Sequence, residues 1–138
     1  MSRSFAAPLD AVDEVEPGAD GVTAIKRIVA TDPYLEGHYP GFPIYPGVFT
    51  VESVYQAARR AVEADRGPDA RVALAAVRSV RFKAPLLPGD VLTVSCRLSA
   101  DPGDPRLIRA VADCRRGDGA ATAKVTLELR VRTEPADA

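Results

Sequence analysis

Four residues in the first half of the chain have the types and spacing needed for proton transfer beside a carbonyl group. His38 is the only histidine in the sequence, and a neutral imidazole can remove or return a proton near pH 7. Glu52 supplies a carboxyl group that could protonate a departing hydroxyl. Gly47 precedes a helical pattern, where backbone N–H groups could hold the oxyanion that forms when a thioester enolises. Gln56 follows Glu52 by one helical turn on the same face.

Each of these residues also has a purely structural interpretation. A lone histidine in a proline-rich loop is more often a capping or packing residue than a catalyst. Glu52 near the start of a helix is explained by the helix dipole, and Gln56 is a good helix former. Gly47 is explained by a tight turn. Residue types alone leave both interpretations open.

A proline-rich loop and one amphipathic helix would position these residues. Residues 32–47 contain four prolines and three glycines. Proline at every third position from Pro40 to Pro46 forces extended backbone and excludes a helix there. Apolar side chains then recur every three or four positions over residues 51–62, which predicts a helix over 48–65. Gly67 and Pro68 are expected to end it.

The remaining segments predict β-strands. Two strand-like stretches precede the loop, the clearer one over residues 21–31, and four strands follow the helix over residues 71–82, 91–98, 107–115 and 121–132. The last of these alternates apolar and polar side chains, as a half-buried antiparallel strand does. One helix and one antiparallel sheet indicate an α+β fold, with the sheet wrapped around a single central helix.

Length and composition predict one domain over residues 1–138, with flexible tails at about 1–4 and 133–138. A net charge of −1 offers no basic surface for nucleic acid. The absence of a long apolar run and of a signal-peptide pattern predicts a cytoplasmic protein with no membrane span. The two cysteines, Cys96 and Cys114, fit a reducing compartment. A single histidine argues against a metal site.

The motif around His38 resembles the signature of the 3-hydroxyacyl-[acyl-carrier-protein] dehydratases of fatty acid synthesis. That family carries His-Phe-Pro-Gly, then Pro-Gly-Val, then Glu. This chain has His-Tyr-Pro-Gly from His38, Pro-Gly-Val around Gly47, and Glu52 fourteen residues after the histidine. Similar blocks at residues 15–26 and 80–90 extend the resemblance over roughly residues 13–98.

The resemblance implies a hot-dog fold and a dehydratase that uses no cofactor. His38 would take the C2 proton of a 3-hydroxyacyl thioester, and the Gly47 amide would form the oxyanion hole at the thioester carbonyl. Glu52 would protonate the leaving hydroxyl, and Gln56 would orient Glu52. The product would be the trans-2-enoyl thioester, in fatty acid or polyketide-type biosynthesis.

The partners are also implied by the resemblance. The substrate would be linked through phosphopantetheine to an acyl carrier protein, and its acyl chain would lie in a tunnel lined by Tyr45 and Phe82. The active sites would lie between two subunits of a homodimer, of a trimer of dimers, or of a heterodimer with a related subunit. Because carrier proteins are acidic, the docking surface should be basic, with the candidates Arg78, Arg81, Lys83, Arg59 and Arg60.

Three alternatives stay open. A hot-dog acyl thioesterase would act on the same thioesters, but it needs no histidine at a fixed distance from the glutamate. A non-catalytic partner subunit of a heteromeric dehydratase would be expected to lack His38 or Glu52, and both are present. Isomerisation of the double bond after dehydration could use the same two groups.

Overall fold

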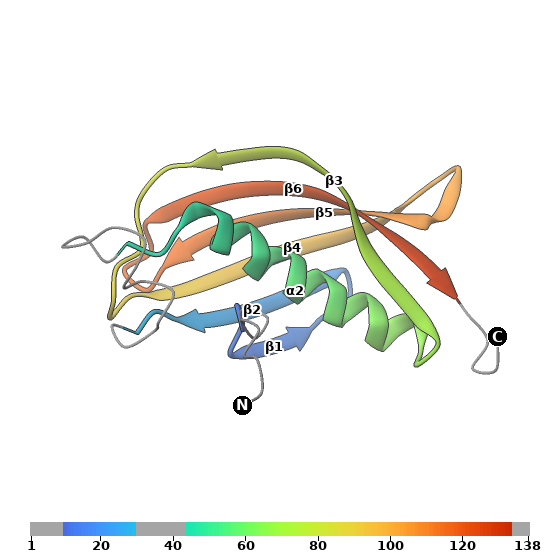
Figure 1. Cartoon of the computed structure of the whole chain (residues 1–138), viewed down its shortest axis with the longest axis horizontal. Helices are drawn as coiled ribbons and strands as arrows, with labels where there is room; N and C mark the ends of the chain where they lie inside the picture. The colour runs from blue at the N-terminus through green and yellow to red at the C-terminus, as the bar shows by residue number, and fades with distance from the viewer. Residues whose placement is uncertain (1–9, 30–43, 134–138) are drawn as a thin grey trace, which may run out of the picture.

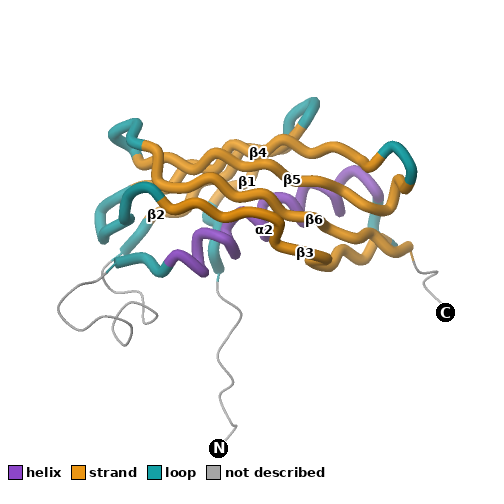
Figure 2. Tube along the Cα trace, turned by 90° about the horizontal axis from the view of Figure 1, so that it is seen from above, coloured by secondary structure: helices purple, strands orange, loops and turns teal. Residues whose placement is uncertain are grey.

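The computed structural model describes residues 10–29 and 44–133, in which one helix lies against a six-stranded sheet (Figure 1). The elements are β1 (Glu14–Pro17), β2 (Gly21–Arg27), α2 (Gly47–Arg66), β3 (Ala70–Phe82), β4 (Val91–Asp101), β5 (Asp104–Arg116) and β6 (Ala121–Thr133). Neighbouring strands pair antiparallel in the order β1-β2-β4-β5-β6-β3. The sheet curves over α2 (Figure 2), so the predicted α+β arrangement is confirmed.

Helix α2 has nearly the predicted bounds. It starts at Gly47, directly after Pro46, and it ends where Gly67 donates its N–H to the Glu63 carbonyl at 2.9 Å. Gly67 has a φ of +100°, which favours glycine and explains why the helix stops there. No helix within the described ranges is both long and apolar enough to cross a membrane.

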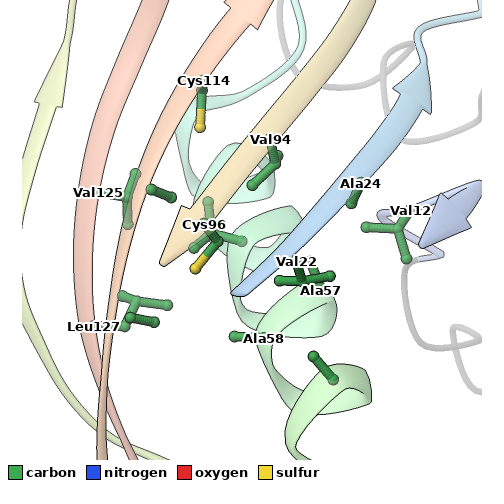
Figure 3. Packing of buried hydrophobic residues seen from close by; sticks show 14 of the residues in the cluster. Val12, Val22, Ala24, Ala57, Ala58, Val94, Cys96, Cys114, Val125 and Leu127 are labelled. Atoms are coloured by element: carbon green, nitrogen blue, oxygen red, sulfur yellow. The ribbon is translucent and has the colours of Figure 1, made fainter. Parts of the chain in front are cut away.

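The core lies between α2 and the concave face of the sheet. Ala57 and Ala58 of α2 are fully buried, and they face strand residues such as Val22 and Val94 (Figure 3). Their small side chains let the helix approach the strands closely. On β6 the alternation is as predicted, with Val125, Leu127, Leu129 and Val131 buried. Burial of these apolar side chains between α2 and the sheet removes them from water and holds the helix in place.

Several strand boundaries differ from the sequence prediction. Strand β2 ends at Arg27 instead of continuing to residue 31, because Ile28 exchanges hydrogen bonds with the turn before β4, at Asp90 and Gly89. Strands β4 and β5 extend to Asp101 and Asp104 and leave a tighter hairpin than the sequence suggested. Thr133, predicted to begin the tail, pairs with Ala70 at the end of β6.

Candidate functional site

The N-terminus of α2 opens into a cleft. Pro46 provides the N-cap and no side chain of the described residues caps the helix. The first helical hydrogen bond runs from the Phe49 N–H to the Pro46 carbonyl at 2.9 Å, so the N–H groups of Gly47 and Val48 have no acceptor within the helix. The cleft has a volume of about 430 Å³. Thr50 and Thr122 line it, together with four residues that were candidates from the sequence: Tyr45, Gly47, Phe82 and Lys83. An anion or a polarised carbonyl would meet the positive end of the helix dipole there.

Phe82 and Gly47 are in close contact across this cleft. A Cβ atom added to Gly47 would lie 2.6 Å from Cζ of the Phe82 ring, so only glycine leaves room for the ring in this position. The ring itself is 55% exposed. Phe82 therefore forms an apolar wall beside the helix end and faces open space on its other side.

Tyr45 supports the start of α2 from within the core. Its ring is buried and packs edge to face on Phe49, with the ring centroids 5.6 Å apart. Its hydroxyl lies 3.1 Å from the Ser53 hydroxyl. Tyr45 thus combines a packing role with a place in the cleft lining, whereas the sequence suggested a tunnel residue alone.

Glu52 and Gln56 are joined as their helical spacing predicts. Gln56 donates an N–H from Nε2 to Glu52 Oε1 at 3.1 Å, and its own carbonyl oxygen accepts the Ala11 N–H at 3.0 Å. Gln56 is buried and Glu52 is partly buried. The buried amide therefore holds the carboxyl group of Glu52 from one side.

His38 lies outside the described residues. The pairing of His38 with Glu52 remains a prediction from the sequence motif.

The basic residues proposed for carrier docking do not form one patch of unpaired charge. Arg78 makes two hydrogen bonds to Glu128, at 2.7 and 3.0 Å, and this bonding lowers the pKa of the Glu128 carboxyl. Lys83 is exposed and lines the cleft, and Arg81, two residues earlier, is exposed as well. On the helix, Arg59 lies 5.8 Å from the centre of the Tyr55 ring and Arg60 pairs with Asp10.

Two residues near the site were not identified from the sequence. Thr122 falls on the polar side of the β6 alternation, yet it is only 2% exposed and its hydroxyl has no partner among the described residues. The chain after β3 covers it, because Lys83 and Ala84 both donate their N–H groups to its carbonyl oxygen. Lys26 is buried as well. Lys26 follows Val22 and Ala24 at intervals of two residues, and this alternation was the available signal that it faces inward.

The two thiols belong to the core and not to the site. Cys96 of β4 and Cys114 of β5 are unpaired with each other and buried (Figure 3). Burial raises the pKa of each thiol to about 12. Because the thiolate is the nucleophilic form, neither cysteine can act as a nucleophile near neutral pH.

Solved structures share this architecture. The dehydratase heterocomplex ApeI:P of Xenorhabdus doucetiae has a TM-score of 0.60, with 21% identity, 85% of this chain and 94% of that chain covered. A thioesterase-superfamily protein of Thermus thermophilus has a TM-score of 0.68, with 17% identity and coverages of 87% and 85%. The fold is therefore the hot-dog fold predicted from the motif. Identities this low establish the fold and leave the reaction undecided.

Sequence relatives are more specific. The enzyme 3-hydroxyacyl-[acyl-carrier-protein] dehydratase FabZ of Polynucleobacter necessarius is 35% identical over 127 residues, covering 90% of this chain and 83% of the relative. FabZ of Polynucleobacter asymbioticus is 36% identical over 124 residues, with coverages of 88% and 81%. The model of the ApeI-like family, described as ApeI dehydratase, matches residues 14–117. The chain belongs to the ApeI-like dehydratase family and is a relative of the FabZ enzymes.

Proposed function

We propose that this dehydratase removes water from a 3-hydroxyacyl thioester carried on an acyl carrier protein. The observation that carries the proposal is the cleft at the start of α2, which is lined by Gly47 at the helix end and by the ring of Phe82. One turn further along the helix, Glu52 is held by Gln56. In the homodimer proposed below, the C3 hydroxyl of a thioester held at this helix end would lie beside the Glu52 carboxyl group of the second copy.

The reaction divides between two groups. His38 takes the proton from C2, and the electron pair of that C–H bond forms the C2–C3 double bond. The C3–O bond breaks, and the hydroxyl leaves as water with the proton from Glu52. Negative charge that develops on the thioester oxygen is stabilised by the Gly47 N–H at the positive helix end. The product is the trans-2-enoyl thioester.

The carrier protein would approach the cleft on the side of Arg81 and Lys83. Both side chains are exposed, and a basic rim attracts an acidic partner. Arg78 contributes less charge to this rim because Glu128 neutralises it. The cytoplasm is the proposed location, and the two unpaired thiols are compatible with its reducing conditions.

A second copy of this chain is the proposed partner of strand β3. This strand lies at the edge of the sheet, with no strand of the described ranges on its outer side. Leu74 is 41% exposed and Val77 is 49% exposed. An unpaired strand edge with exposed apolar side chains is a surface for pairing. In the resulting homodimer, Glu52 of one copy would face His38 of the partner subunit.

Replacing Val77 by aspartate is expected to turn this dimer into a monomer. Two charges brought together across a two-fold axis repel each other and lose the apolar contact. Light scattering after size exclusion should then report the mass of one chain instead of two. Val29→Asp is the matched control, because Val29 is equally exposed, at 49%, and lies after β2 instead of on β3. A Val77→Asp variant that stays dimeric would place the interface elsewhere.

Gly47→Ala is expected to fold normally and to lose activity. The new methyl group meets the Phe82 ring at 2.6 Å, but the exposed ring can swing away, so the free energy of unfolding should change by less than about 1 kcal/mol. The methyl group and the displaced ring would crowd the helix end and lower kcat/KM about 100-fold. Gly117→Ala, where the nearest atom is 3.9 Å away, is the control.

A double variant sharpens this prediction. Adding Phe82→Ala to Gly47→Ala removes the ring that the methyl group displaces, so part of the lost activity should return. Full activity in Gly47→Ala alone would show that the thioester does not bind at this helix end.

Mass spectrometry of the thioester tests the function directly. A 3-hydroxyacyl group on a carrier protein, incubated with the purified chain, should lose one water, and the loss should vanish in His38→Ala. Release of the free acid would identify a thioesterase. No change with acyl groups of several lengths would identify a non-catalytic subunit.

A further inference from the structure

Lys26 is a buried cation beneath the first described residues of the chain. It follows Val22 and Ala24 on the core-facing side of β2, and only 8% of its surface is exposed. A buried ammonium group needs polar partners. Two lie among the described residues: the Asp10 carbonyl oxygen is 2.8 Å from Nζ, and the Asp13 carboxylate is 3.7 Å from it.

The peptide group that joins Asp10 to Ala11 is held at both ends. Its carbonyl oxygen accepts a hydrogen bond from Lys26 Nζ, and its N–H donates to Gln56 Oε1 at 3.0 Å. A cation at the carbonyl polarises the peptide group and strengthens its N–H as a donor. The two contacts together fix the position and the tilt of this peptide relative to α2.

This peptide determines which way the Gln56 side chain faces. A backbone N–H can only donate, so the Gln56 atom beside Ala11 must be the oxygen. The amide nitrogen is then turned toward Glu52 and donates to Oε1. In a protonated carboxyl group the carbonyl oxygen is the better acceptor, so this bond to Oε1 favours the acid proton on Oε2. The carboxyl group therefore presents one defined oxygen as the proton donor.

We propose that Lys26 is a positioning residue for Glu52, acting through the peptide between Asp10 and Ala11 and the Gln56 amide. The proposal rests on the dehydration proposed above, in which Glu52 is the acid. Lys26 is not among the residues that line the cleft. Its ammonium group holds the peptide, the peptide orients the amide, and the amide holds the Glu52 carboxyl.

Other contacts keep the segment folded without Lys26. Val12 is buried in the core, and the Asp13 N–H donates to the Ile25 carbonyl at 2.7 Å. Arg60 also reaches Asp10. Loss of the ammonium group should therefore loosen one peptide and leave the fold in place, so the effect should appear in catalysis.

The experiment compares Lys26→Met, Lys26→Arg and the control Lys124→Met, whose lysine is exposed on β6. For Lys26→Met we expect kcat to fall about 10- to 100-fold, since a small misplacement of a catalytic group has effects of this size. KM should change by less than about twofold. Lys26→Arg should recover most of the loss because it keeps the charge and N–H donors. Lys26→Gln, which keeps a donor without charge, replaces Lys26→Met if that variant does not fold.

A double variant tests whether the effect passes through Glu52. In a Glu52→Gln background, adding Lys26→Met should lower the residual kcat by less than about twofold, because two residues in one chain of contacts are not additive. The same loss in both backgrounds would overturn the proposal. So would a folded Lys26→Met variant with unchanged kcat.

The positioning can also be followed without turnover. In ¹H–¹⁵N spectra, Lys26→Met should shift the Ala11 amide and the Gln56 side-chain amide resonances, whereas Lys124→Met should leave them unchanged. If the wild-type chain dehydrates no substrate, the proposed function fails while these shifts still report on the contacts. Unchanged Gln56 resonances would refute the positioning role by themselves.

Discussion

Replacing Glu52 by glutamine is expected to lower kcat for dehydration by about a thousandfold, because an amide cannot deliver the proton that the leaving hydroxyl needs. The fold should remain, since the two side chains have the same shape and Glu52 is only partly buried. The new carbonyl oxygen can still accept the N–H from Gln56. Substrate binding should therefore be preserved, and the loss should appear in kcat more than in KM. Steady-state measurement of enoyl-thioester formation gives both constants.

Glu63→Gln is the matched control for this variant. Glu63 lies on the same helix three turns later and is also partly buried, so the substitution makes the same chemical change away from the hydrogen bond between Glu52 and Gln56. It should leave kcat unchanged. A fully active Glu52→Gln variant would show instead that His38 handles both proton transfers.

Mixing two inactive variants tests whether each site is shared between subunits. A dimer of one His38→Ala chain and one Glu52→Gln chain has one site with both defects and one site with neither. Random pairing after co-expression should then restore about a quarter of the wild-type activity. A site built within a single chain would recover nothing, because each chain lacks one of the two groups. Activity in the mixture would therefore support both the catalytic pair and the proposed homodimer.

Local patterns made much of this architecture predictable. The helix bounds followed from apolar side chains at helical spacing and from Gly67, whose φ of +100° stops the helix. The strand that carries Leu127 and Leu129 alternates apolar and polar side chains, so its core-facing side could be identified. In both cases the pattern of one segment determines its own structure. The hydrogen bond between Gln56 and Glu52 was predictable for the same reason, because residues four positions apart on a helix lie on the same face.

Contacts between distant segments were not predictable in this way. Thr122 is buried where the chain after β3 passes beside it, and alternation within β6 carries no sign of that cover. Lys26 is buried because residues 10–13 return across β2 and bring a carbonyl oxygen to its ammonium group. The close approach of Phe82 to Gly47 joins residues that are 35 positions apart. Each of these depends on tertiary packing, where a residue's partner lies in another element.

Val54→Asp is expected to unfold the protein. Val54 is fully buried on the sheet-facing side of α2. Aspartate there loses the apolar contact and places a carboxylate among apolar neighbours, at a cost of more than about 4 kcal/mol. Domains of this size have a free energy of unfolding of about 5–15 kcal/mol, so little or no folded population should remain. Circular dichroism through a urea titration measures that population.

Val48→Asp makes the same substitution six residues earlier on the same helix and provides the comparison. Val48 is 67% exposed, and an acidic side chain in the first turn interacts favourably with the helix dipole. Its free energy of unfolding should stay within about 0.5 kcal/mol of the wild type. The two variants share the original residue type, the new charge and the helix, so the difference between their free energies of unfolding reports the effect of burial. A stable Val54→Asp variant would mean that α2 faces the sheet with a different side, which would also move Gln56 away from Ala11 and remove the hydrogen bond by which it orients Glu52.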